Sequence, residues 1–164
     1  MADRRPVAAS DAPEALVERA LAGEEGAFAR IVRKHRDPMV RVALVVTGDV
    51  AGADDAVAAA WPAAWGRLGR LRKPERLEAW LCAIAAEEAG RVVRVRARLA
   101  DAESGDATAV DEAAGPVAPG GLTSLPTAAA DSDLAERVDG LPTADRALLA
   151  LRLVAGLTPD ELGR

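Results

Sequence analysis

Arginines are the residues in this sequence whose type and spacing best suit binding chemistry. Arg91, Arg94 and Arg98 recur at intervals of three and four residues, so a helix would place them on one face, with Arg96 beside them. The guanidinium group is a fork-shaped donor that matches the oxygens of a phosphate. The stripe therefore predicts either a phosphate-binding surface or an ordinary solvated helix face, and its spacing alone leaves both interpretations open.

A second group of basic residues lies just before the same predicted helix. Its members are Arg67, Arg70, Arg72, Lys73 and Arg76. Residues 67–98 carry 9 basic and 4 acidic side chains, although the whole chain has a net charge of −5. The acidic excess lies elsewhere, because residues 101–132 contain 6 acidic side chains and no basic one. A locally basic segment can bind phosphate whatever the charge of the whole chain.

The tryptophans, the one cysteine and the one histidine are the other side chains with distinctive chemistry. Trp61, Trp65 and Trp80 lie on apolar stripes and are expected in the core, although Trp80 could also support an unstacked base. Cys82 is expected to be a small core residue, and His35, inside a run of basic residues, is expected on a solvated face. One cysteine and one histidine cannot build a His/Cys zinc site, and no nucleophile–base pair emerges. We therefore expect no metal, no cofactor and no enzymatic activity.

An acidic stretch without basic residues covers residues 49–66 and contains Asp49, Asp54 and Asp55. These carboxylates favour the N-terminus of a helix, where they interact well with the helix dipole. The same residues would also form a patch for a basic protein partner.

Four helical patterns account for the first hundred residues. They run from Asp11 to Gly23, from about Glu24 to Thr47, from near Asp49 or Ala53 to Leu68, and from Pro74 to Leu99. Pro62 lies inside the third pattern and is expected to weaken it by about 3 kcal/mol. No alternating pattern indicates a strand, and no apolar run approaches the ~18–20 residues of a membrane span. The sequence predicts an all-α, cytoplasmic protein.

The composition divides the chain into three parts. Residues 11–100 are expected to form one helical domain, and residues 101–132 an acidic, disordered linker. Residues 133–164 are expected to hold a further helix, capped by Thr143, and the start of another that the sequence does not complete. We expect this last part to be loosely ordered, with the side chains of Leu148, Leu149 and Leu153 exposed or folded back on the first domain.

The order of these elements resembles that of an extracytoplasmic-function (ECF) sigma factor, the small two-domain type of the bacterial sigma-70 family. The matching segments include Thr47-Gly48-Asp49, Asp54-Asp55-Ala56-Val57, Leu77-Glu78-Ala79-Trp80-Leu81, the arginine-rich residues 91–98, and Asp145-Arg146-Ala147-Leu148-Leu149. The resemblance implies a sigma region 2 domain at 11–100 and an incomplete region 4 helix-turn-helix at 133–164.

The resemblance also implies partners and site residues. The helix at about 53–65 would bind the clamp of core RNA polymerase, and the loop at 68–76 with the fourth helix would bind the −10 element of promoter DNA. The polymerase contacts would be Asp54, Asp55 and Trp61. The DNA contacts would be Arg70, Arg72, Lys73, Arg76, Trp80, Arg91, Arg94 and Arg98.

Several positions depart from the family pattern. Ala58 and Ala59 replace a usual polar residue, Pro62 interrupts the polymerase-binding helix, and Glu87 and Arg91 replace a usual Asn and Asp. The helix that would read the −35 element is also missing, so the chain is expected to be truncated within region 4. Two functions follow as hypotheses. The first is a sigma-like transcription initiation factor, and the alternative is a shortened, degenerate sigma that occupies polymerase or an anti-sigma partner without initiating transcription.

Overall fold

The structure, a computed structural model, describes residues 12–103 and 137–157. Its helices are α1 (Pro13–Leu21), α2 (Glu25–Thr47), α3 (Val50–Arg67), α4 (Leu77–Glu103) and α6 (Thr143–Val154), and two short 3-10 helices, η1 (Leu68–Arg70) and η2 (Pro74–Arg76), precede α4. The described residues contain helices and no strand, which confirms the predicted all-α class.

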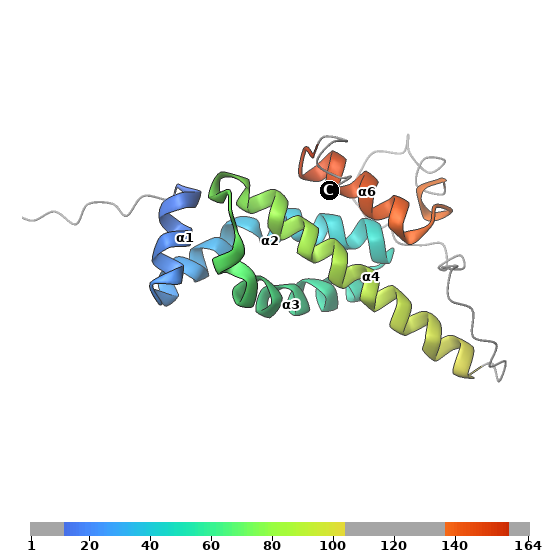
Figure 1. The fold of residues 1–164 in the computed structure, drawn as a ribbon. Helices are drawn as coiled ribbons and strands as arrows, with labels where there is room; N and C mark the ends of the chain where they lie inside the picture. The colour runs from blue at the N-terminus through green and yellow to red at the C-terminus, as the bar shows by residue number, and fades with distance from the viewer. Residues whose placement is uncertain (1–11, 104–136, 158–164) are drawn as a thin grey trace, which may run out of the picture.

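The long helices α2, α3 and α4 pack against one another and form the body of the fold (Figure 1). Helix α1 lies against α2 and against both 3-10 helices, and α6 lies against α2 and α4. The C-terminal part of α4, yellow in Figure 1, extends beyond the other helices. Because the core ends there, Val95 and Leu99 continue the apolar pattern of α4 but are more than half exposed.

Small side chains bring α3 close to its neighbours. Ala53, Ala56, Ala60 and Ala64 recur at intervals of three and four residues and are fully buried. They belong to the same core as larger buried side chains of α2 and α4, such as Ile31, Met39 and Leu81. Helices with small residues at their contact can approach closely, so these four alanines serve packing.

A tight turn at residues 47–49 joins α2 to α3. Gly48 has a φ of 81°, a left-handed conformation that suits glycine at the end of a helix. Asp49 then caps α3, because its Oδ1 accepts a hydrogen bond of 2.7 Å from the backbone N–H of Gly52. The turn fixes where the acidic end of α3 lies relative to α2.

Some local expectations were wrong. The expected cost of Pro62 is not among these and stays a prediction, since α3 continues through this exposed proline as the helical pattern indicated. Thr143 does not cap α6 but begins it, and its Oγ1 is buried with no hydrogen-bond partner among the described residues. Residues 101–103, placed in the linker by composition, continue α4, and the rest of that predicted linker lies outside the described residues.

Helix α6 packs onto the first helical unit rather than standing apart. Ala150 is 1% exposed and belongs to the same core as the residues of α2 and α4, with Leu151 and Val154 packed at its edge. The opposite side of α6 faces solvent, with Leu148 44% and Leu153 73% exposed. The leucines of this segment were expected to be either exposed or folded back on the first domain. The helix as a whole folds back, while Leu148 and Leu153 stay exposed.

Candidate nucleic-acid interface

The basic loop, residues 68–76, lies between α3 and α4. Two fully buried leucines, Leu68 and Leu77, fix its two ends in the core. The side chains of Arg70, Arg72, Lys73 and Arg76 are all exposed. Buried anchors flanking exposed cations hold the loop in place while leaving its charges in water, so the predicted loop residues form one solvent-facing group.

One exposed stripe follows the whole length of α4. At 100° per residue, the α4 positions 80, 83, 87, 91, 94 and 98 fall within an arc of about 80°, and Arg76 of η2 directly precedes the helix. All are exposed except Trp80, which is half-buried against the core. The stripe therefore joins the basic loop to the arginines at the far end, about 22 Å from residue 76 to residue 91 along the axis.

Arg91 differs from the other two arginines of the stripe because it is already paired. Its Nη2 donates to Glu87 Oε1 at 2.7 Å, and its Nη1 donates to Glu88 Oε1 at 3.0 Å. Glu87 also accepts from Arg67 Nη1 at 2.9 Å, and this bond is the main reason that the pKa of Glu87 lies below its ordinary value. A phosphate at Arg91 would have to compete with these carboxylates.

Arg94 and Arg98 have no ion pair with any described residue. Both are exposed on the part of α4 that extends beyond the bundle. Their charges can therefore meet a phosphate without first breaking an ion pair within the described chain. Of the predicted stripe, these two positions and the basic loop are the best placed for DNA contact.

Arg96 points to the other side of α4 and holds α3. Its Nη1 donates to Asp49 Oδ2 at 2.5 Å, and its Nη2 lies 3.8 Å from Asp55 Oδ2. Asp49 thus uses one oxygen to cap α3 and the other to bind α4. The sequence did not indicate this role, because the two residues are 47 positions apart.

The acidic patch on α3, Asp54 and Asp55, lies on an exposed face. Asp54 Oδ1 accepts from Arg36 Nη2 at 3.2 Å, and Asp55 makes the longer contact with Arg96. Such exposed pairs contribute about 0–1 kcal/mol each, so a basic partner protein could replace them at little cost. The two predicted carboxylates are therefore together and accessible.

The same face of α3 is apolar toward its C-terminal end. Ala58, Pro62 and Trp65 are exposed there, and the side chain of Trp65 is 48% exposed. Its ring packs edge-on against Phe28, with centroids 4.7 Å apart, which holds it in one orientation. Trp61, the predicted contact, lies half-buried at the edge of this face, with its ring centroid 6.1 Å from that of Phe28. The core location expected for Trp65 was wrong.

His35 is buried, not solvated. Its ring is 3% exposed between α2 and α4, and its Nδ1 lies 3.2 Å from Glu78 Oε2. Burial lowers the pKa of His35, and the hydrogen bond with Glu78 opposes this shift. Cys82, as expected, is a buried core residue, and burial raises the pKa of its thiol to about 12. At neutral pH this cysteine is therefore a protonated core side chain.

Two searches of the described part of the chain were negative. It contains no group of three or more His, Cys, Asp or Glu side chains that could hold a metal ion. None of its helices combines the length and apolar character needed to cross a membrane.

Comparison with known proteins matches part of the chain to a protein family. Residues 31–99 match the family model described as Sigma-70 region 2. Searches of curated proteins and of solved structures gave no match. The matched segment begins within α2 and ends within α4, so it contains the basic loop, the exposed stripe of α4 and the acidic patch of α3. Residues 31–99 are therefore similar to a sigma-70 region 2 domain.

Proposed function

We propose that this protein is a sigma-like transcription initiation factor of the ECF type, which binds core RNA polymerase and the −10 element of promoter DNA. The observation that carries the proposal is the coincidence of the sigma-70 region 2 match with two opposite kinds of surface. One is the basic loop together with Arg94 and Arg98, and the other is the acidic and apolar face of α3.

The DNA surface works through exposed positive charge. The four cations of the basic loop would neutralise phosphates of a separated strand, and Arg94 and Arg98 would contact the adjacent duplex. Trp80 lies on the same stripe, one turn beyond the basic loop, where its half-exposed ring would support the loop and stack with an extruded base. Arg91 would contribute less, because Glu87 and Glu88 hold its guanidinium.

Binding of −10 promoter DNA at several salt concentrations tests this surface. We expect Arg94→Ala together with Arg98→Ala to reduce the salt slope of binding by about two, one for each lost contact. Arg91→Ala is the matched control from the same stripe and should change the slope by much less, because its carboxylate partners already offset its charge. Equal slopes for the wild type and the double variant would show that the stripe is only a solvated face.

The polymerase surface combines charge with an apolar anchor. Asp54 and Asp55 would meet cations of the clamp, and Trp65 with Pro62 would bury apolar area beside them. Aromatic side chains at the centre of an interface often carry much of its free energy. Trp61 lies at the edge of this face and would add a smaller contact with polymerase at the border of the interface.

Co-purification with core polymerase tests this second surface. We expect Trp65→Ala, and separately Asp54→Lys with Asp55→Lys, to weaken binding at least tenfold, since hot-spot side chains cost about 2 kcal/mol or more. Glu25→Lys, an exposed charge reversal on α2, is the control and should bind as the wild type does. Undiminished binding by both α3 variants would place the polymerase contact elsewhere on the molecule.

The alternative function, a degenerate sigma that occupies polymerase or an anti-sigma partner, receives support from one observation. Helix α6 lies against α2 and α4 instead of standing free as part of a separate DNA-binding unit. Transcription in vitro from a −10/−35 promoter by core polymerase and this chain separates the two functions. Specific transcripts favour the initiation factor, whereas stable polymerase binding without transcripts favours the degenerate sigma that only occupies polymerase.

A further inference from the structure

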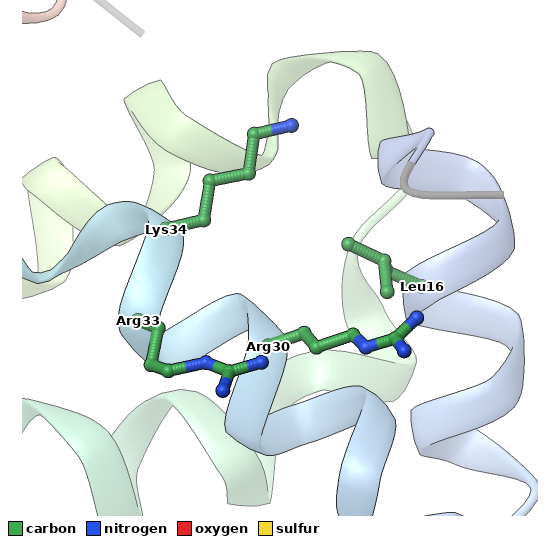
Figure 2. A pocket seen from close by; sticks show the side chains of 4 residues that line it. All are labelled: Leu16, Arg30, Arg33 and Lys34. Atoms are coloured by element: carbon green, nitrogen blue, oxygen red, sulfur yellow. The ribbon is translucent and has the colours of Figure 1, made fainter. Parts of the chain in front are cut away.

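A cavity of about 470 Å³ lies between α1 and α2, outside the surfaces described above. It is lined by Leu16 of α1 and by Arg30, Arg33 and Lys34 of α2. Figure 2 shows Arg30 and Lys34 extending from α2 toward α1 on two sides of the cavity, with Leu16 opposite them. Among the described residues, the cavity is therefore lined by one apolar side chain and three cations.

The spacing of these cations brings like charges together. Arg30, Arg33 and Lys34 are separated by three and four residues and so share one face of α2. Like charges at this spacing cost a few tenths of a kcal/mol each. Glu24 accepts from Arg19 Nε at 2.7 Å, and this bond, with a smaller effect from the charge of Arg30, lowers the pKa of Glu24. An anion in the cavity would accept charge-assisted hydrogen bonds from such cations.

The cavity borders the basic loop. Helix α1, which forms one of its walls, packs against both η1 and η2 of that loop. On the α2 side, Lys34 precedes His35, whose Nδ1 lies 3.2 Å from Glu78 in the first turn of α4. In Figure 2 the green ribbon of this part of the chain passes next to the cavity. The cations of the cavity thus continue the positive surface of the basic loop onto α2.

We propose that this cavity binds a backbone phosphate of the same DNA strand that the basic loop contacts. The inference rests on the proposed function, and it adds a phosphate site on α2 that lies outside the stripe of α4. Arg30 and Arg33 offer fork-shaped donors that match two phosphate oxygens, and Lys34 adds a mobile point charge.

Single-stranded DNA binding by the full chain tests the proposal. The test variant is Arg33→Gln with Lys34→Gln, because both residues are exposed and their loss leaves the core intact. The matched control is Arg41→Gln, an exposed arginine two turns further along α2 and outside the cavity. Arg70→Gln with Arg72→Gln reports on the basic loop itself. We expect the cavity variant to bind about tenfold more weakly at low salt. Its salt slope should fall by about 0.7, the loss of one single-strand phosphate contact.

Oligonucleotides with one neutral methylphosphonate linkage locate the phosphate. One such linkage should weaken binding to the wild-type chain but not further weaken binding to the cavity variant. If no linkage behaves in this way, while inorganic phosphate at constant ionic strength still competes with DNA only in the wild type, then the cavity binds free phosphate and the strand assignment is wrong.

The outcomes separate this inference from the proposed function. If the loop variant loses affinity and the cavity variant does not, the inference is overturned and the proposed DNA binding stands. If neither variant loses affinity, both are overturned. If Arg41→Gln weakens binding as much as the cavity variant does, the effect is general charge rather than a site, and the inference also fails.

Discussion

At the scale of single residues, packing changes the chemistry that the sequence suggests. His35 lies in the segment Arg33-Lys34-His35-Arg36, which reads as a solvated basic face. In the structure its ring is buried while its neighbours are exposed, because residue 35 is the one position of this segment that turns toward α4. A contact with Glu78, 43 residues away, cannot be derived from local sequence.

The burial of His35 predicts how stability depends on pH. Its pKa in the folded state lies below the ordinary value of 6.5, chiefly because burial disfavours the charged ring. The unfolded chain therefore binds the proton more readily, so the free energy of unfolding should fall as the pH drops through 6.5. The slope is at most about 1.4 kcal/mol per pH unit. Urea unfolding between pH 7.5 and 5.5 measures it.

Two variants identify His35 as the source of this dependence. His35→Gln removes the titrating ring and should flatten the profile, whatever its effect on absolute stability. Glu78→Gln removes the group that raises the pKa of His35, so the loss of stability at low pH should become larger. Equal slopes for the wild type and His35→Gln would assign the pH dependence to other groups.

At the scale of elements, the ends of α2 and α3 were predictable and their mutual attachment was not. Gly48 and Asp49 are a stop and a start signal that can be recognised in the sequence, and the structure uses both. The bond from Arg96 to Asp49 depends on how α4 crosses α3. Likewise, the apolar spacing of Trp61 and Trp65 did not reveal that α3 exposes the second ring, because exposure depends on where the neighbouring helices end.

Gly52 makes the contact between α3 and α4 possible. A Cβ atom at this position would lie 2.8 Å from Arg96 Nη1 and 3.0 Å from the Cβ of Thr47. The arginine can move, but Thr47 is buried and its Cβ is fixed by the backbone. We expect Gly52→Ala to lower the free energy of unfolding by about 1–3 kcal/mol, as overpacking does, and to displace Arg96 from Asp49. Thermal and urea unfolding measure the effect.

Gly66 provides the control on the same helix. A Cβ atom there would meet nothing within 4 Å, so Gly66→Ala should only gain helix propensity and raise stability by up to about 1 kcal/mol. The two substitutions make the same chemical change and are expected to have opposite signs. A stabilising Gly52→Ala would mean that the α2–α3 turn yields more easily than its geometry suggests.

At the scale of the whole molecule, the placement of α6 is the feature that the sequence left open. Its apolar pattern predicted a helix, but the residues it packs against belong to α2 and α4, at least 40 positions earlier. Several polar groups in and next to α6 are also buried without hydrogen-bond partners among the described residues. Arg146 is 2% exposed, and its Nε has no hydrogen-bond partner among the described residues. Asp139 Oδ1 and Thr143 Oγ1 are also buried without a hydrogen-bond partner among the described residues.

Unpaired buried polar groups make this contact weak and therefore adjustable. Burial lowers the pKa of Arg146, which expresses the cost of holding its charge away from water, and the charge of Asp139 offsets only part of that cost. Replacing a buried, poorly paired charge with an apolar side chain of similar size is often stabilising by 1–4 kcal/mol. Ala150, by contrast, is fully enclosed in the contact and has no room for a charge.

Hydrogen exchange of α6 amides tests this interpretation. We expect Arg146→Met to slow exchange in α6 by about tenfold or more, since 1.4 kcal/mol corresponds to a factor of ten. Ala150→Glu should release α6 and speed its exchange, while the amides of α2 and α3 keep their protection because the core of those helices does not depend on α6 alone. Leu148→Glu, on the exposed side of α6, is the control and should leave the exchange of both α6 and the other helices unchanged.

Two results would contradict this interpretation. Loss of protection in α2 together with α6 would show that the helix is an integral part of one cooperative core. A faster exchange in Arg146→Met would show that the buried guanidinium holds α6 in place.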